Sequence, residues 1–327
     1  STIQRMPTPE HLRTPPAKML MRPLPPQLQQ IVELNLNEDP ERRQQDLLHI
    51  KTWLKKQRHL CPRTDDQWLL TFLRGCKFSL AKTKQKLETY YTMRTALPEF
   101  FSNRDPHLPQ LQQIMNLGMC FPLPEPDNLG RRVFFFRIGV SDPNKMKLVD
   151  FFKLNYMNMD IVLAEDDRAI ICGDVTIIDL QGITLAHATQ LQPALIKRAV
   201  VCYQEAYPIR PQSINVINIP AAFESVLTFI MGFIKDELKQ RIVIHPKNDL
   251  SLLYQTIPQK ILPIEYGGCS GTIKDNAKAW KDKVEEYSDW FKEDSLYCSD
   301  ESKRIGQSKL RDDLFGLEGS FRTLNVD

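Results

Sequence analysis

Between residues 132 and 245, short apolar runs rich in β-branched and aromatic side chains alternate with longer segments of helical periodicity. The strand-like runs span residues 132–140, 170–180, 213–219 and 241–245, and the helical segments span residues 147–163, 186–203 and 222–235. Parallel strands must be joined by crossovers long enough to hold a helix. The alternation therefore predicts an α/β fold in which helices flank a mostly parallel sheet.

Helical patterns also lie on both sides of this layer. Before it, Trp68, Phe72 and Cys76 recur at helical spacing, and residues 80–95 continue in the same way. After it, an amphipathic helix is expected at residues 276–292. We therefore divide the chain into four parts: a Pro-rich arm at 1–26, an all-helical domain at 27–105, the α/β domain at 106–270, and a C-terminal amphipathic helix with a loosely held tail at 271–327.

The charge balance argues against one kind of binding partner. The chain has 43 basic and 40 acidic residues, a net charge of +3, which argues against a nucleic-acid-binding protein because such domains are usually strongly basic. Residues 74–94 hold six basic residues and one acidic residue, whereas residues 275–301 hold nine acidic residues and four lysines. These two segments form either a basic and an acidic face or two ordinary solvated helix surfaces.

The cysteine pattern indicates a cellular compartment. Seven cysteines lie far apart and none forms a CxxC pair. Their odd number and spacing predict neither a disulfide framework nor a zinc site, and favour a reducing cytosol. The chain has no run of 18 apolar residues, so no membrane-spanning helix is predicted. Its first residues also lack the apolar core of a signal peptide. We expect a cytoplasmic protein.

Sequence patterns of catalysis are absent or weak. The chain contains no GxGxxG, GxxxxGK or GxSxG motif, and its six histidines share no metal-like spacing. Cys298 and Arg304 have the spacing of a phosphatase loop, but the loop has no glycine and carries two acidic residues. Asp174 and Asp179 are either an acid/base pair or strand-end carboxylates that cap a loop, and the second interpretation is favoured. We expect no metal, no cofactor and no enzyme activity.

Residues 221–234 read AAFESVLTFIMGFI and carry a single charge. Phe223, Val226, Leu227, Ile230 and Ile234 form one apolar face, and further apolar residues occupy the other sides. A surface helix normally keeps one polar face. The segment is therefore either a fully buried core helix or a lid with one face over a cavity and the other toward a membrane.

Five motifs stand in the order and at the spacing of the CRAL-TRIO family, which the chain resembles over residues 45–270. They are FLRGCKF at 72–78, GRRVFFF at 130–136, IDLQG at 178–182, INIP at 217–220 and ILPIEYGG at 261–268. The chain is more similar to the branch that carries tocopherol and retinaldehyde than to the yeast phosphatidylinositol transfer branch.

The resemblance implies a helical N-terminal unit and an α/β lipid-binding domain with one hydrophobic ligand between sheet and helices. A gate helix at residues 222–235 would cover that ligand. Family positions that contact the ligand correspond to Phe152, Asn155, Met159, Ile178, Cys202, Tyr203, Tyr207, Ile209, Ile214, Phe223, Val226, Leu227 and Ile230. Asn155, Tyr203 and Tyr207 would orient it, although tyrosines on an apolar helix face are also common core residues.

The resemblance also implies a phosphoinositide-binding surface beside the gate. Arg210, Lys239 and Arg241 match the basic positions of the tocopherol carrier, and Arg74 and Lys235 are added as candidates. Two positions depart from the family pattern. Glu237 stands where the tocopherol carrier has lysine, with Lys235 as a replacement two residues earlier, and Cys76 stands where the first motif has arginine.

These observations lead to one main hypothesis and two alternatives. The main hypothesis is a monomeric, non-catalytic carrier that binds a retinoid, tocopherol or carotenoid in an internal cavity and exchanges it at phosphoinositide-containing membranes. The first alternative is a phosphoinositide-dependent adaptor in vesicle traffic, with the Pro-rich arm and acidic helix binding partner proteins. The second, a lipid-modifying enzyme, is disfavoured because no catalytic pattern supports it.

Overall fold

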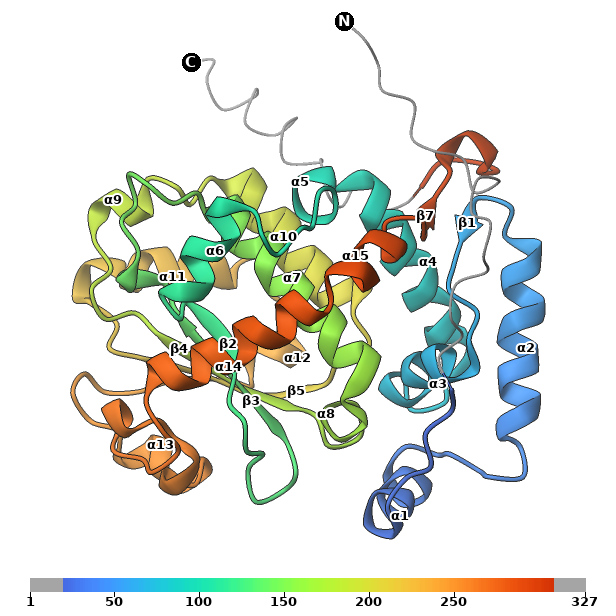
Figure 1. Cartoon of the computed structure of the whole chain (residues 1–327), viewed down its shortest axis with the longest axis horizontal. Coiled ribbons are helices and arrows are strands. Elements are labelled where there is room, and N and C mark those ends of the chain that lie inside the picture. Colours follow the sequence, from blue (N-terminus) through green and yellow to red (C-terminus); the bar gives the residue numbers. More distant parts are fainter. Residues whose placement is uncertain (1–19, 309–327) are drawn as a thin grey trace, which may run out of the picture.

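The computed structural model describes residues 20–308, which form an α/β layer with a helical unit packed at one end (Figure 1). The sheet has the strand order β2-β3-β4-β5-β6. β3 (Arg132–Arg137), β4 (Asp174–Asp179), β5 (Pro211–Ile217) and β6 (Ile242–Ile244) run parallel to one another, and β2 (Cys120–Pro122) runs antiparallel to β3. The predicted α/β fold with a mostly parallel sheet is confirmed.

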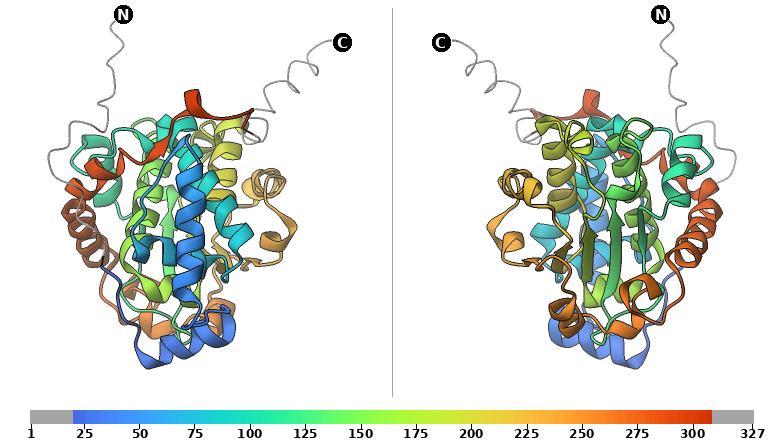
Figure 2. Two further views of the ribbon diagram at one scale, coloured as in Figure 1. Left: turned by 90° about the vertical axis from the view of Figure 1, so that its right-hand side faces the viewer. Right: turned by 90° about the vertical axis from the view of Figure 1, so that its left-hand side faces the viewer.

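Helices cover both faces of this sheet. The crossovers contain α7 (Leu148–Glu165), α8 (Asp167–Cys172), α9 (Leu185–Ala188), α10 (Pro193–Ala206), α11 (Glu224–Met231) and α12 (Asp236–Lys239). α13 (Ser251–Thr256), α14 (Ile273–Glu286) and α15 (Ser288–Asp294) follow the last strand. Figure 2 shows α11 and α12 on one side of the molecule and α14 on the opposite side, with the strands between them.

The strand register gives the two faces of the sheet different roles. Successive side chains of a strand point to opposite faces. Phe135 and Ile177 are paired in register and fully buried, and they belong to the main core together with Tyr266. The Phe135 and Tyr266 rings lie 4.7 Å apart in an edge-to-face arrangement. The next residue along each strand, Phe136 after Phe135 and Ile178 after Ile177, faces the other way, toward α11.

The helical unit contains α1 (Pro26–Asn35), α2 (Arg43–Lys56), α3 (Asp66–Gly75), α4 (Leu80–Ala96) and α5 (Pro98–Phe101), and α6 (Pro109–Asn116) leads into the sheet. It is not wholly helical, because β1 (Leu60–Cys61) pairs with β7 (Cys298–Ser299). The chain near residue 300 is thereby held against the helical unit, where a loose tail was expected. The predicted arm up to residue 19 and the tail from residue 309 lie outside the described residues.

A buried ion cluster joins the helical unit to the rest of the fold. Asp294, at the end of α15, is 1% exposed. It accepts hydrogen bonds from Arg63 at 3.1 Å and from Arg104 at 2.5 Å, and it forms an ion pair with Arg94 at 2.7 Å. Burial alone would raise the pKa of Asp294, but the three guanidinium groups hold it below its usual value. Asp160 of α7 pairs with Arg94 and Arg104 from the other side.

Several element boundaries differ from the predictions. The predicted strand at 170–180 begins at Asp174, because Ala169 donates to the Asp166 side chain and starts a helical turn. Gly173 ends that turn with φ of +89°, a conformation that strongly favours glycine. Residues 138–140 form a short 3-10 helix rather than the end of a strand.

The predicted helices at 186–203, 222–235 and 276–292 are each broken. In the first, α10 starts at Pro193, which suits the first turn because proline has no N–H to leave unbonded. In the second, a 3-10 turn at Ala221–Phe223 precedes α11, which ends at Met231 before Gly232. In the third, Tyr287 separates α14 from α15.

Candidate functional site

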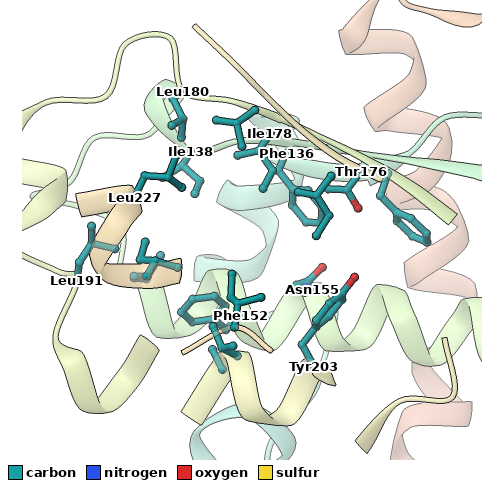
Figure 3. A pocket seen from close by; sticks show the side chains of 18 of the residues that line it. Phe136, Ile138, Phe152, Asn155, Thr176, Ile178, Leu180, Leu191, Tyr203 and Leu227 are labelled. Atoms are coloured by element: carbon teal, nitrogen blue, oxygen red, sulfur yellow. The ribbon is translucent and has the colours of Figure 1, made fainter. Parts of the chain in front are cut away.

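An apolar cavity of about 320 Å³ lies between the sheet and α11. Its walls come from β3, β4, β5 and β6, from α7 and α10, and from the segment that includes α11 and α12. Figure 3 shows Leu180, Ile138 and Leu227 on one side of this cavity. The oxygen atoms of Thr176, Asn155 and Tyr203 lie on the other side. The cavity therefore has an apolar end and a more polar end.

The sheet supplies its wall through strand alternation. Phe134, Thr176 and Ile214 are paired across three strands, and all three face the cavity. The next row along the strands is Phe136, Ile178 and Val216. Because the intervening residues fill the core on the opposite face, the same strands hold a packed interior and an open cavity on their two sides.

Two helices supply the facing wall. On α7, Phe152, Asn155 and Met159 follow each other at spacings of three and four residues, so they share one helix face. On α10, Val200 and Tyr203 share a face in the same way. Asn155 is a half-buried amide whose nitrogen contacts the Met159 sulfur at 3.7 Å. These helices thus provide a mostly apolar surface with isolated polar groups.

The segment at 221–234 covers the cavity as a lid. Val226, Leu227 and Ile230 of α11 line the cavity, yet no side chain of α11 is fully buried. Phe229 points away and is 41% exposed. A core helix would bury side chains on every side, so the structure supports the lid interpretation of this segment over the buried-core interpretation.

The structure brings most of the predicted ligand-contacting residues together on the cavity wall. Those that line it are Phe152, Asn155, Met159, Ile178, Tyr203, Ile209, Ile214, Phe223, Val226, Leu227 and Ile230. Cys202 and Tyr207 do not. Both are buried in the core that α10 shares with the helical unit. Cys202 is about 100° around the helix from Tyr203, and the Tyr207 ring stacks on Tyr156 at 5.5 Å.

The sequence analysis missed other cavity residues. Phe134, Phe136 and Thr176 were predicted to lie in strands but were not assigned to the cavity, and Asp174 was interpreted as a loop cap. Alternation along the strand was the available signal. It places Asp174, Thr176 and Ile178 on one face once any one of them is assigned.

Two of the five predicted phosphoinositide-binding residues, Arg74 and Arg210, are not freely exposed at the surface. Arg74 is 2% exposed and pairs with Glu38 through bonds of 2.9 and 3.1 Å. Arg210 is partly buried and donates to the carbonyl oxygens of Ile170 and Ile171. Their guanidinium groups serve internal partners. Because Arg74 and Arg94 both point inward, the predicted basic face of residues 74–94 is correspondingly weaker.

The other three basic candidates lie beside the lid and reach solvent. The Lys235 side chain is 61% exposed and pairs with Glu205. The Lys239 nitrogen lies 3.5 Å from Asp236 in the same helix. Arg241 is exposed. The nearby acidic residues partly neutralise this group, so its positive potential is modest.

The three groups considered for catalysis, Cys298, Asp179 and Asp174, have different environments in the structure. Burial raises the pKa of the Cys298 thiol, which is the opposite of what a nucleophilic thiolate needs. Asp179 accepts bonds from the Tyr266 hydroxyl and from Asn218, so it fixes the loops at the end of β4. Asp174 has no such partner among residues 20–308.

This fold and cavity define a class: proteins that enclose a hydrophobic molecule between a mostly parallel sheet and a covering helix. A model of the CRAL/TRIO domain matches residues 116–268, and a model described as "Pinta-like, UBA domain" matches residues 39–111. The chain belongs to the CRAL/TRIO family.

Several known proteins are similar to this chain over most of its length. The mouse (Mus musculus) "Alpha-tocopherol transfer protein-like" is 30% identical over 239 residues, which cover 73% of this chain and 68% of that protein. Mouse clavesin-1 is 29% identical over 81% of this chain and 76% of its own length. Human (Homo sapiens) clavesin-2 is 28% identical over 75% of each. A solved structure, that of Sfh5, has a TM-score of 0.49 and 15% identity over 78% of this chain and 92% of that chain.

Proposed function

We propose that the protein is a non-catalytic carrier that holds one hydrophobic molecule of the retinoid, tocopherol or carotenoid type in the cavity beneath α11. The cavity carries this proposal. Its volume of about 320 Å³ falls within the range of about 300–1,000 Å³ typical of small-molecule pockets, and its walls are almost entirely apolar. The name of the mouse relative, which refers to tocopherol transfer, supports a role in moving a lipid.

The energetics suit reversible carriage. A terpenoid that buries about 500 Å² would gain on the order of 12 kcal/mol at roughly 25 cal/mol per Å². Association costs of about 4–15 kcal/mol offset much of that gain. The net affinity is therefore enough to keep the molecule out of water and small enough to permit release at a membrane.

The proposal is tested by filling the cavity. Ile178 lies in the middle of the sheet wall, so an Ile178→Trp substitution places an indole where the ligand would lie. The matched control is Ile244→Trp, at a position 49% exposed on β6. We expect the control to take up fluorescent retinol and α-tocopherol like the unchanged chain, and the Ile178 variant to lose uptake while its circular dichroism spectrum is kept.

The purified unchanged chain provides a second readout. Organic extraction or native mass spectrometry should recover one lipid per chain, or the empty protein should take up a retinoid, a tocopherol or a carotenoid. A protein that contains no lipid and takes up none of the three would refute the proposal.

We propose that exchange occurs at phosphoinositide-containing membranes, where α11 opens. The exposed Phe229 ring and the basic residues Lys235, Lys239 and Arg241 support an orientation in which α11 faces the membrane. Each basic residue near an anionic surface contributes about 1 kcal/mol. Lys239→Ala with Arg241→Ala should therefore weaken binding to phosphoinositide vesicles by roughly thirtyfold, without changing ligand affinity in detergent.

The control for this experiment removes two lysines elsewhere. Lys278 and Lys292 are exposed and paired with acidic neighbours on α14 and α15. Their joint replacement by alanine should leave vesicle binding nearly unchanged. Equal loss in both double variants would indicate a general charge effect, and loss of ligand affinity in the first would indicate a structural role for Lys239 and Arg241.

We propose further that the carrier uses no cofactor and stays only transiently on membranes in the cytoplasm. Across residues 20–308, no three His, Cys, Asp or Glu side chains are grouped so that they could hold a metal ion. Within that same range, no helix is both long and apolar enough to cross a bilayer. A metal analysis of the purified chain and fractionation of cells expressing it test these two points.

A further inference from the structure

The polar end of the cavity is formed around a buried carboxyl group. Asp174 is the first residue of β4, is 5% exposed, and lines the cavity. It shares its strand face with Thr176 and Ile178, so the wall changes from acidic to hydroxyl to aliphatic along β4. A carboxyl group in an apolar cavity is costly to bury unless it is bonded.

Within residues 20–308, no side chain or backbone group donates a hydrogen bond to the Asp174 carboxyl group. The nearest cation is Arg210, whose guanidinium opposes the effect of burial but donates to the carbonyls of Ile170 and Ile171 instead. Burial raises the pKa of Asp174 to about 7, so near neutral pH much of the group is an unpaired carboxylate. A ligand that donates a hydrogen bond would remove this penalty.

The groups around Asp174 define what that ligand must offer. Burial raises the pKa of the Tyr203 hydroxyl, and the nearby Asp174 carboxylate raises it further. Neither the Tyr203 nor the Thr176 hydroxyl has a hydrogen-bond partner among the described residues. The Tyr203 and Thr176 hydroxyl groups lie at the same end of the cavity (Figure 3), and Asp174 shares the strand face of Thr176 two residues earlier.

We infer that the ligand is a hydrophobic alcohol whose hydroxyl group lies at this end of the cavity, where it donates to Asp174 and accepts from Tyr203 or Thr176. The inference rests on the proposed carrier function and names the chemical class of the cargo. An alcohol is the simplest group that both donates and accepts. A hydrogen bond to a charged acceptor is also stronger than one between neutral groups.

Other headgroups fit this end less well. A fatty or retinoic acid would bring a second carboxylate next to Asp174 in a medium of low dielectric constant. An aldehyde or ester can only accept a hydrogen bond, so it pairs with Asp174 only while that carboxyl group is protonated and leaves the ionised form unpaired. A hydrocarbon leaves both forms unpaired. An ammonium group would lose its hydration and approach the positive Arg210.

The experiment compares headgroups on two scaffolds with the purified full-length chain. The probes are retinol, retinaldehyde and retinoic acid, and α-tocopherol with its acetate ester. The unchanged chain should bind each alcohol about tenfold or more tightly than the matched acid or ester. At pH 8, where most of the Asp174 carboxyl group is ionised, Asp174→Leu should lower the affinity for the alcohols by about tenfold and change the affinity for retinaldehyde by less than twofold. Asp174→Asn keeps a neutral acceptor and should give an intermediate result.

The matched control is Asp249→Leu, which replaces an exposed aspartate and should leave all affinities unchanged. Unchanged alcohol binding by Asp174→Leu, or tightest binding of retinoic acid by the unchanged chain, would overturn the inference while leaving the carrier function intact. If Asp174→Leu does not fold, the headgroup series on the unchanged chain and on Asp174→Asn decides. Failure of both scaffolds to bind in any form, together with no recovered lipid and no carotenoid uptake, would instead refute the carrier proposal.

Discussion

A carboxyl group kept for a ligand should reduce the stability of the empty protein, and Asp174 allows this to be measured. The pKa of Asp174 rises from 3.8 to about 7 in the fold because of burial, with Arg210 opposing. One pKa unit corresponds to about 1.4 kcal/mol. At pH above 7, ionised Asp174 therefore costs the fold up to about 4 kcal/mol.

The sign follows from proton linkage. Because the folded state holds its proton more tightly than the unfolded state, the penalty is absent below pH 3.8, grows as pH rises toward 7, and is constant above that. Asp174→Asn cannot ionise and avoids the penalty. We expect the variant to be more stable than the unchanged chain by up to about 4 kcal/mol at pH 8 and by about 2 kcal/mol or less at pH 5.

The assay is urea denaturation of both ligand-free proteins at pH 5 and pH 8. Asp249→Asn is the matched control. Hydrogen bonds from Ser251 lower the pKa of Asp249 in the unchanged chain, so the contribution of Asp249 to stability is present at neutral pH and lost on acidification. The control should thus be no more stable than the unchanged chain at pH 8. If Asp174→Asn shows no gain at pH 8, or the same gain at both pH values, the reasoning about Asp174 is wrong.

Three further predictions test the rest of the structure. Asp294→Ala removes a carboxylate from buried guanidinium groups and should lower the free energy of unfolding by about 3–5 kcal/mol in urea denaturation. The control is Asp289→Ala, because the Asp289 side chain is 99% exposed and pairs with Lys292 at the surface; it should lower the free energy of unfolding by less than about 1 kcal/mol. Gly75→Ala should lower thermal stability by an equivalent of about 1–3 kcal/mol, because a Cβ there meets the carbonyl oxygen of Pro208; an unchanged melting temperature would show that this contact relaxes freely. Phe229→Asp should weaken vesicle binding and leave ligand affinity unchanged in detergent, and reduced ligand affinity would place Phe229 inside the cavity instead.

The order of strands and helices was predictable because it depends on local patterns. Residues such as Val175 and Ile177 lie in a strand buried on both faces, and such strands read as short apolar runs. The same pattern was ambiguous at Ile170 and Ile171, where an apolar helical turn resembles the start of a strand. The cap formed by Asp166 resolves the ambiguity, but only once the backbone path is known.

The cavity was predictable in part. Periodicity assigns residues to a face, and the family resemblance identifies which face meets the ligand. Together they assigned both Tyr203 and Cys202 to the ligand, although Tyr203 lies on the cavity wall and Cys202, one position earlier, lies in the core. The ion cluster was not predictable, since Arg63 and Asp294 are 231 residues apart and no local pattern relates them.

The distribution of packing is compatible with the opening that the proposed carrier function requires. β4 buries Val175 and Ile177 in the main core, and the ion cluster holds the helical unit against α7 and α15. Ile230 of α11 packs against this core, but no side chain of α11 is fully buried. A fully buried aliphatic side chain contributes about 1.5–3 kcal/mol, so lifting α11 costs far less than unfolding the layer beneath it. In the proposed carrier, the lid would therefore move while β4, which carries Asp174, stays in place.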